Sequence, residues 1–253
     1  MDLTNGNQQQ NEATKLGSIK TDSRFAALAW STGESSTTTT TTTNNSKKYP
    51  MGLLAGGMEN GTVHVWDPRT VIQQQPQTPS TTTTTTAIAS FSQHVSGPVK
   101  ALQFSPLVPT HLATGGSDGK VLIIDVDRPD LAPFIPCANN TQQRAQITSI
   151  AWNTQVAHIV ASAASDGTVG IWDIKSRKAW CELRAGDQAV SDVAWNPAQG
   201  FHLLTASGDD RNPVIKLWDL RASTSMPLAT LAGHSQGILS MSWCPHDEHL
   251  LLS

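Results

Sequence analysis

The chain has 253 residues, enough for one large β domain or two smaller ones, and its 17 basic and 20 acidic residues give a net charge of −3. This balance shows no basic footprint for nucleic acid, and no apolar run approaches the roughly 20 residues that span a bilayer. The polar N-terminus lacks the regions of a signal peptide, and the three distant cysteines, Cys137, Cys181 and Cys244, fit a reducing cytosol better than a disulfide framework. The sequence therefore predicts a soluble, cytosolic protein.

The N-terminal part of the sequence has a polar lead-in followed by one strand-rich unit. Residues 1–23 are rich in Asn, Gln and Thr, and we predict a flexible segment there. Strands are then expected near 24–30, 52–57, 62–66 and 87–91. Between them we expect two Thr-rich loop insertions, at 31–50 and 68–87, which contain the threonine runs 37–43 and 81–86. Tolerated repeat expansion at loop tips is the favoured interpretation, and a phosphorylation or binding segment is the alternative.

Three further units repeat the pattern of the first. They cover about 98–136, 146–184 and 189–232, and a fifth begins at Ile238 and is cut off at Ser253 within its second strand. The first unit ends in Trp66-Asp67, and the next three end in Ile124-Asp125, Trp172-Asp173 and Trp218-Asp219. A turn, a strand and Trp-Asp at a period of 46–48 residues are typical of a WD40 β-propeller. We predict an all-β WD40 β-propeller over 24–253, truncated in its fifth blade.

A second repeated position supports this fold. An aromatic residue ends the first strand of each unit: Trp30, Phe104, Trp152, Trp195 and Trp243. Seven of the eight tryptophans in the sequence thus occupy only two positions of one repeat. Such repetition predicts a layered core that needs a bulky side chain at fixed heights.

The polar residues of the repeat are expected to be structural. Resemblance to WD40 blades implies a hydrogen-bonded set of a turn Asp, a His from the preceding loop, a strand Ser or Thr, and the Trp indole N–H. The third unit supplies Asp166, Ser162 and Trp172, and the second supplies Asp118, Thr114 and His94, with Ile124 in place of the donor Trp. Because buried polar groups are usually paired, this interpretation is favoured over general acid–base roles. The predicted structural positions are Trp66, Asp67, Asp118, Asp125, Ser162, Asp166, Trp172, Asp173, Trp218, Asp219 and His234, the last as the clearest Gly-His that opens a repeat.

No motif indicates catalysis. The sequence has no Gly-rich phosphate loop, nucleophile elbow or His-Glu-x-x-His. His246 and His249 follow Cys244 at a spacing like that of metal ligands, but a strand end and a loop explain them equally well, and a structural zinc site needs more ligands. We predict no catalytic residue, cofactor or metal. The lengthened turn Asp209-Asp210-Arg211 is the candidate rim feature for contacts, with a solvated turn as the alternative.

Several longer sequence segments are more specific for one family than the Trp-Asp pair alone. They include Ser207-Gly-Asp-Asp-Arg-Asn-Pro-Val-Ile-Lys-Leu-Trp-Asp-Leu-Arg221, Leu53-Leu-Ala-Gly-Gly-Met-Glu-Asn-Gly-Thr-Val-His-Val-Trp-Asp-Pro68 and His234-Ser-Gln-Gly-Ile-Leu-Ser-Met-Ser-Trp243. Over residues 22–253 the sequence resembles the N-terminal propeller of the larger subunit of the COPII outer coat. The resemblance implies a seven-bladed parent, followed by a segment that completes the propeller of a smaller WD-repeat subunit, an α-solenoid, and a Pro-rich region that contacts the inner coat.

The resemblance implies a structural component of the COPII cage that supports vesicle budding and transport from the endoplasmic reticulum to the Golgi. Expected partners are other coat propellers at cage vertices, the smaller WD-repeat subunit through regions that this sequence lacks, and inner coat subunits through the parent protein. Nucleic acid is not expected. Membrane association is expected to be peripheral, on the cytosolic side of exit sites and vesicles. The alternatives are a generic WD40 adaptor or substrate receptor and an enzyme built on a propeller.

Overall fold

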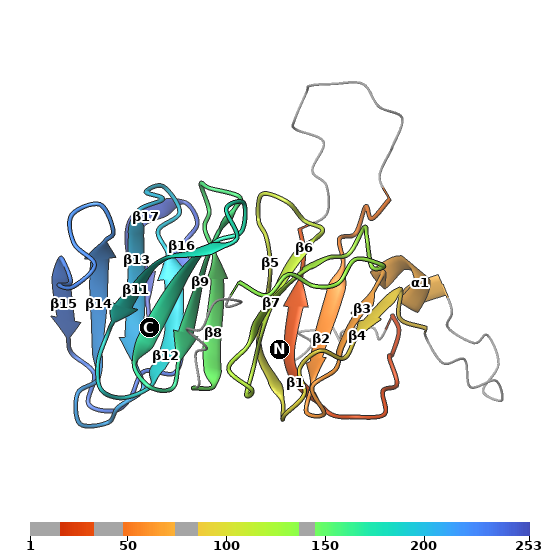
Figure 1. Cartoon of the computed structure of the whole chain (residues 1–253), viewed down its shortest axis with the longest axis horizontal. Helices are drawn as coiled ribbons and strands as arrows, with labels where there is room; N and C mark the ends of the chain where they lie inside the picture. Colours follow the sequence, from red (N-terminus) through yellow and green to blue (C-terminus); the bar gives the residue numbers. More distant parts are fainter. Residues whose placement is uncertain (1–15, 33–47, 74–85, 137–144) are drawn as a thin grey trace, which may run out of the picture.

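The computed structural model describes residues 16–32, 48–73, 86–136 and 145–253. Its strands form antiparallel sheets that follow one another in sequence and stand side by side (Figure 1). Because each sheet pairs strands that are neighbours in sequence, every sheet is one blade of a propeller. The predicted all-β WD40 propeller is confirmed. None of the helices in these ranges has the length and apolar character needed to cross a bilayer.

Each blade is a meander whose first strand is the inner one. Blade 1 comprises β1 (Phe25–Trp30), β2 (Leu54–Met58), β3 (Val63–Trp66) and β4 (Ala89–Phe91). Blade 2 has β5 (Val99–Phe104), β6 (His111–Gly116) and β7 (Val121–Asp125), and blade 3 has β8 (Ile147–Trp152), β9 (Ile159–Ala164), β10 (Thr168–Asp173) and β11 (Lys178–Arg184). Blade 4 has β12 (Val190–Trp195), β13 (His202–Ser207), β14 (Val214–Asp219) and β15 (Ala229–Ala232), and blade 5 contributes β16 (Ser242–Cys244) and β17 (Asp247–Leu252).

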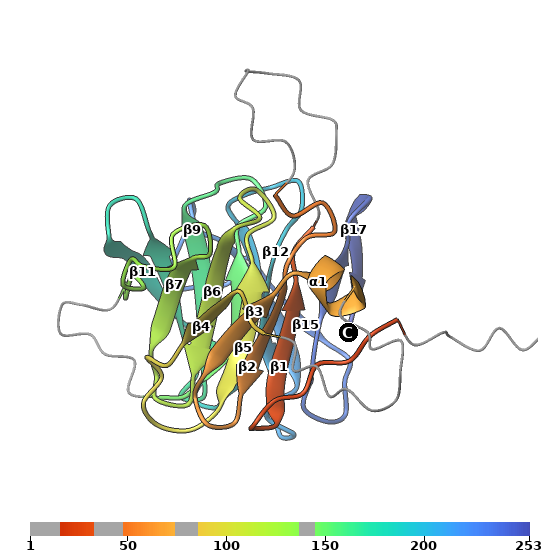
Figure 2. The same cartoon turned by 90° about the vertical axis from the view of Figure 1, so that its right-hand side faces the viewer.

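The hydrophobic core lies between adjacent blades rather than inside one sheet. The inner strands β1, β5, β8 and β12 contact one another in that order, and β16 contacts β12 (Figures 1 and 2). Apolar clusters fill the space between blades 1 and 2, 2 and 3, 3 and 4, and 4 and 5. A blade with neighbours on both sides buries both faces, which is why all six residues of β9 are buried. Burial on both faces also explains why β9 reads as an apolar run instead of an alternating pattern.

The inner strands share one irregularity. The register with the second strand shifts near the start of β1, β5, β8 and β12, so that one residue in each strand is bulged. A β-bulge changes the direction of the side chains beside it. Lys100 and Thr148, which lie at this position in blades 2 and 3, line a cavity of about 290 Å³ between β1, β5 and β8.

The turn between the second and third strands needs glycine in three blades. Gly61, Gly119 and Gly167 have φ between 73° and 85°, a region that side chains rarely adopt. A Cβ on Gly167 would also lie 2.1 Å from the carbonyl oxygen of Gly186, in the loop that leads to the next blade. The Asn-Gly and Asp-Gly signals of the repeat therefore mark turns that pack against the following loop.

Two parts of the fold differ from the sequence prediction. Over its described residues, up to 136, blade 2 forms three strands rather than four, and an isolated bridge between Ile123 and Phe134 stands where an outer strand was expected. Where a loop was expected after Trp66-Asp67, the backbone forms the helix α1 (Pro68–Gln73). Asp67 caps it by accepting the backbone N–H of Arg69 at 2.9 Å, and proline suits the first helical position.

The remaining expectations about the insertions and the N-terminus fall largely outside the described residues. The threonine run 37–43 and nearly all of the run 81–86 lie there, as do residues 1–15 of the predicted flexible segment. Gly17, in the described part of that segment, packs against Val71 of α1.

Candidate functional site

Blade 2 assembles the expected polar set around a histidine. The Nδ1 of His94 lies 2.9 Å from Oδ1 of Asp118, and its Nε2 lies 2.9 Å from the hydroxyl of Thr114. The imidazole and carboxylate are almost fully buried, with exposures of 1% and 7%. Asp118 also accepts the backbone N–H of Lys120 and that of Val95. The loop before the blade and the turn within it are thereby joined by one carboxylate.

Blades 3 and 4 bond the strand hydroxyl to the indole instead. The Nε1 of Trp172 donates to Ser162 at 2.8 Å, and that of Trp218 donates to Thr205 at 3.0 Å. Both indoles are buried. The turn carboxylate of blade 3, Asp166, accepts the backbone N–H and the hydroxyl of Thr168, two residues further on. Its role therefore includes closing its own turn.

The first blade and the fifth carry partial versions of the set. Trp66 is buried against Phe25 at a centroid distance of 6.0 Å. The Nε2 of His234 lies 2.8 Å from the hydroxyl of Ser253, which corresponds to the contact of His94 with Thr114. Unlike His94, His234 is exposed.

The aspartates of the three Trp-Asp pairs and of Ile124-Asp125 perform one local task in four blades. Each accepts the backbone N–H two residues later: Asp67 from Arg69, Asp125 from Asp127, Asp173 from Lys175, and Asp219 from Arg221. This is the Asx-turn geometry that closes a tight turn after a strand. These carboxylates lie on the opposite side of the blades from the His94 set, because they follow the third strand rather than the second.

The charge state of two of these aspartates reflects the same contacts. The backbone N–H of Arg221 lowers the pKa of Asp219, with help from the positive charge of Arg221 and from the nearby His202, although burial opposes the shift. Burial raises the pKa of Asp173, but hydrogen bonds from Ser176 and Lys175 outweigh it and leave the pKa below its ordinary value. Both groups are therefore ionised acceptors and poor general acids.

The tryptophans of the inner strands join one blade to another. Trp152 donates its Nε1 to the carbonyl of Gln103 in blade 2 at 2.9 Å, and Trp195 donates to the carbonyl of Ala151 in blade 3 at 3.0 Å. Trp30 instead donates to Met51 within blade 1. The tryptophans that end the inner strands thus include connections between neighbouring blades.

Asp192 makes a further connection that the sequence did not indicate. It accepts hydrogen bonds from Ser149 in blade 3 at 2.7 Å and from the backbone N–H of Met241 at 2.7 Å and the hydroxyl of Ser240 at 3.2 Å, both before β16. One carboxylate therefore links three consecutive blades. A comparison of the inner strands could have singled it out, because blade 2 has Ala101 at the same position.

The candidate rim turn is only partly exposed. Asp209 accepts the backbone N–H of Arg211 at 3.0 Å, and its carboxylate is 18% exposed. Asp210 accepts the N–H of Gly237 at 2.8 Å, which holds the loop that leads to blade 5. The guanidinium side chain of Arg211 is 81% exposed. Its Nε lies 3.4 Å from Oδ1 of Asp209, and the exposed remainder of the guanidinium can contact a partner surface.

Within the described ranges, no group of three or more His, Cys, Asp or Glu residues could hold a metal ion. His249 lies beside Glu248, with 3.7 Å between Nε2 and Oε1, and its side chain is 82% exposed. Burial raises the pKa of Cys181 to about 11, so this thiol is a weak nucleophile at neutral pH.

The geometry defines a WD-repeat β-propeller whose repeated polar residues connect loops, turns and neighbouring blades. A family model described as nucleolar protein 10-like, N-terminal domain, matches residues 21–214, and the WD domain, G-beta repeat, matches residues 225–253. The chain therefore belongs to the nucleolar protein 10-like family of N-terminal β-propellers.

Individual relatives bear a different name. The protein transport protein SEC31 of Dictyostelium discoideum is 34% identical over all of this chain, and that of Chaetomium globosum is 38% identical over 96% of it. The chain spans only 17–18% of the length of these curated relatives. The solved structure titled "COPII on membranes, outer coat vertex" is similar to this chain with 28% identity and a TM-score of 0.66. The match covers 90% of this chain and 70% of the chain in that structure. The predicted resemblance to the larger outer-coat subunit is confirmed.

Proposed function

We propose that the chain is a non-enzymatic propeller of the COPII outer coat, which supports vesicle budding and protein transport from the endoplasmic reticulum to the Golgi. The observation that carries the proposal is the similarity to SEC31 proteins over the whole sequence, at 34–38% identity. The propeller shared with an outer coat vertex supports the same role.

The mechanism that we propose is geometric. Apolar clusters between the blades and hydrogen bonds from Trp152, Trp195 and Asp192 hold the sheets in fixed orientations. A body of this kind can present loops at constant positions, and many weak contacts between such bodies assemble a cage through multivalency. Its proposed partners are other propellers at the vertices and, through further regions of the parent protein, the smaller WD-repeat subunit and the inner coat.

The location follows from the role. We place the protein on the cytosolic side of exit sites of the endoplasmic reticulum, attached to the membrane only through other coat proteins. The repeated polar residues act as structural connections, and Arg211 of the turn Asp209-Asp210-Arg211 is the proposed contact residue at the rim.

Localisation in cells tests the proposal against the one alternative that an observation favours. The description of the matching family model names a nucleolar protein. A fluorescently tagged protein should form puncta that coincide with inner-coat markers at exit sites. Nucleolar staining without such puncta would exclude the coat assignment.

A charge reversal then tests the rim. Arg211→Glu should reduce cage assembly in a reconstituted coat, because the residue is exposed on the face that carries the His94 set. The matched control is Lys175→Glu, an exposed cation in a turn on the opposite face. Equal assembly by both variants would remove Arg211 from the proposal without affecting the coat assignment.

A further inference from the structure

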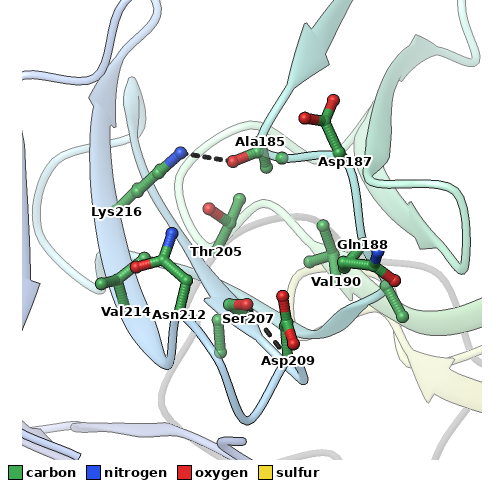
Figure 3. A pocket seen from close by; sticks show the side chains of 13 residues that line it. Ala185, Asp187, Gln188, Val190, Thr205, Ser207, Asp209, Asn212, Val214 and Lys216 are labelled. Carbon is green, nitrogen blue, oxygen red and sulfur yellow. Dashed lines mark hydrogen bonds between the residues drawn. The ribbon is translucent and has the colours of Figure 1, made fainter.

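Blade 4 contains a cleft that none of the roles described above uses. It lies between the loop 185–190 and the turn 207–214, and its volume is about 140 Å³. Figure 3 shows Lys216 and Asn212 on one side, Val190 and Gln188 on the other, and Thr205 between them. We call this feature the blade-4 cleft.

The corresponding place in blade 2 is filled. His94 and Ala185 each stand five residues before the valine that begins the inner strand, and Asp118 and Asp209 each follow the strand threonine by four residues. In blade 2 the imidazole of His94 occupies the space between Thr114 and Asp118. Blade 4 keeps the threonine and the aspartate, but Ala185 provides only a methyl group. The cleft in blade 4 therefore corresponds to the space that the imidazole ring of His94 fills in blade 2.

Lys216 brings a positive charge to this space. It stands two residues before Trp218, where blade 2 has the buried Leu122 two residues before Ile124. Its Nζ donates to the carbonyl oxygen of Ala185 at 2.5 Å (Figure 3). An ammonium group has three N–H donors, so the bond to one carbonyl leaves two N–H groups of Lys216 able to donate further hydrogen bonds.

No carboxylate of the described residues compensates that charge through an ion pair. The two acidic residues of the cleft lining have arginine neighbours: Asp209 lies 3.4 Å from Nε of Arg211, and Asp187 lies 3.5 Å from Arg184. None of the ion pairs between described residues includes Lys216. The lining itself carries two carboxylates and one cation, and each carboxylate is paired with an arginine outside the lining, which leaves Lys216 as the charged group of the lining without an ion-pair partner among the described residues.

A second donor faces the same space. Thr205 is 2% exposed, lines the cleft and accepts the indole N–H of Trp218. A hydroxyl that accepts one hydrogen bond still has its own proton to donate. The amides of Asn212 and Gln188, two exposed residues of the lining, add donors. A ligand that accepts several hydrogen bonds and carries a negative charge matches this lining.

We propose that the blade-4 cleft binds a carboxylate group of a partner protein, supplied either by an acidic residue or by the terminal carboxylate of the partner. Lys216 is its charged partner, and Thr205 donates a hydrogen bond to it. The volume holds several water molecules, which is room for a carboxylate and its methylene stem but not for an element of secondary structure. The inference concerns this site alone and does not depend on which complex the protein joins.

An NMR titration of the 253-residue chain tests the proposal with three small probes. N-acetylglutamate α-amide offers the carboxylate of an acidic residue, N-acetylglycine offers a terminal one, and N-acetylglutamine α-amide is the neutral control. At least one charged probe should shift the backbone amides of 185–190 and 207–214 in a saturable way, while the neutral probe should not. The charged probe that binds more tightly identifies the source of the carboxylate. Absence of saturable shifts with both charged probes would overturn the proposal.

Two substitutions sharpen the test. Lys216→Met keeps the length of the side chain but removes the charge, and it should weaken binding about tenfold or more, as expected for a lost charge-assisted hydrogen bond. The control Lys120→Met, in the turn between β6 and β7 of blade 2, should leave the affinity unchanged. Ala185→His should fill the cleft with an imidazole, as in blade 2, and abolish binding in a protein whose melting temperature is not lowered. Unchanged affinity in folded Lys216→Met, or undiminished binding in folded Ala185→His, would refute the assignment.

Discussion

Blades 2 and 4 solve one packing problem with different residues. Blade 2 places His94 between Thr114 and Asp118 and has the apolar Ile124 on its third strand. Blade 4 replaces the histidine by Ala185, bonds Thr205 to the indole of Trp218, and lengthens the turn after Asp209. A repeated fold can therefore keep its geometry while one member of a polar set is lost, provided that another donor satisfies the buried hydroxyl. The lost imidazole leaves space that becomes available for binding.

Loss of the indole should be the most damaging single change in this comparison. Trp218 is 1% exposed, contributes to the core between blades 3 and 4, and supplies the donor to Thr205. Trp218→Ala should lower the free energy of unfolding by about 3–5 kcal/mol, the range for large-to-small changes in a core. Chemical denaturation measures this loss. The matched change Trp180→Ala, on an indole that is 45% exposed, should cost much less, and equal losses would show that blade 4 does not depend on the buried ring.

Removal of the His94 imidazole should cause the next largest loss of stability. His94→Ala leaves the buried Thr114 hydroxyl and the nearly buried Asp118 carboxylate without the imidazole that joins them. Unpaired buried groups of this kind cost about 1–3 kcal/mol each, so we expect a loss of about 3 kcal/mol in the free energy of unfolding.

The exposed counterpart provides the control for that change. His234 contacts Ser253 in blade 5 but is open to solvent, which can replace its partners. His234→Ala should therefore change stability by less than about 0.5 kcal/mol, as for ordinary surface substitutions. A loss as large as that of His94→Ala would mean that burial is not the source of the difference.

The repeat made most of this architecture predictable. Its period located the blades, and the strands of blade 1 begin and end within two residues of their expected positions. The helix α1 was not predicted because Asp67 and Pro68 fit the end of a Trp-Asp unit, although the same two residues form a helix start. Up to residue 136, where the described part of blade 2 ends, the expected outer strand is reduced to a single bridge at Phe134, because a period cannot show how far the last segment pairs.

The polar sets were less predictable, because their partners come from different strands and loops. The motif brought His94, Asp118 and Thr114 together, as well as Ser162 and Trp172, and the structure shows these contacts. Contacts between blades, such as that of Asp192 with Ser149, follow from how sheets stack and leave no local pattern. Aligning blades 2 and 4 would have shown Asp192 opposite Ala101, and Lys216 opposite Leu122, as charged residues at positions that are apolar in blade 2.

Asp192 extends the comparison to the inner strands. Asp192→Ala gives blade 4 the methyl group that blade 2 has at this position, and it removes the acceptor shared by Ser149, Ser240 and the N–H of Met241. We expect a loss of about 1–3 kcal/mol, since these three hydrogen bonds are only partly buried or exposed and water replaces part of the interaction. Proteolysis should cleave the variant faster between blades 4 and 5, because the link to the loop before β16 is gone. A variant as stable as the unsubstituted protein would show that packing alone joins the three blades.

The smallest effect should come from the turn aspartate of blade 4, and it should depend on pH. The contacts with Arg221 lower the pKa of Asp219 in the folded protein, so its contribution to stability is fully present above the ordinary pKa of an aspartate, 3.8. It is lost as the pH falls through the lower folded-state pKa, because protonation then favours the unfolded state. Asp219→Asn should therefore destabilise the protein slightly at pH 7, by less than about 1 kcal/mol for a solvent-screened group, and the difference from the parent should shrink as the pH falls below 3.8. Melting temperatures of the two proteins between pH 7 and pH 3 measure this convergence. A difference in melting temperature that stays constant over the range would mean that the charge of Asp219 contributes nothing to stability and that only the shape of its Asx turn matters. Asp125→Asn would then test the same point in the equivalent turn of blade 2.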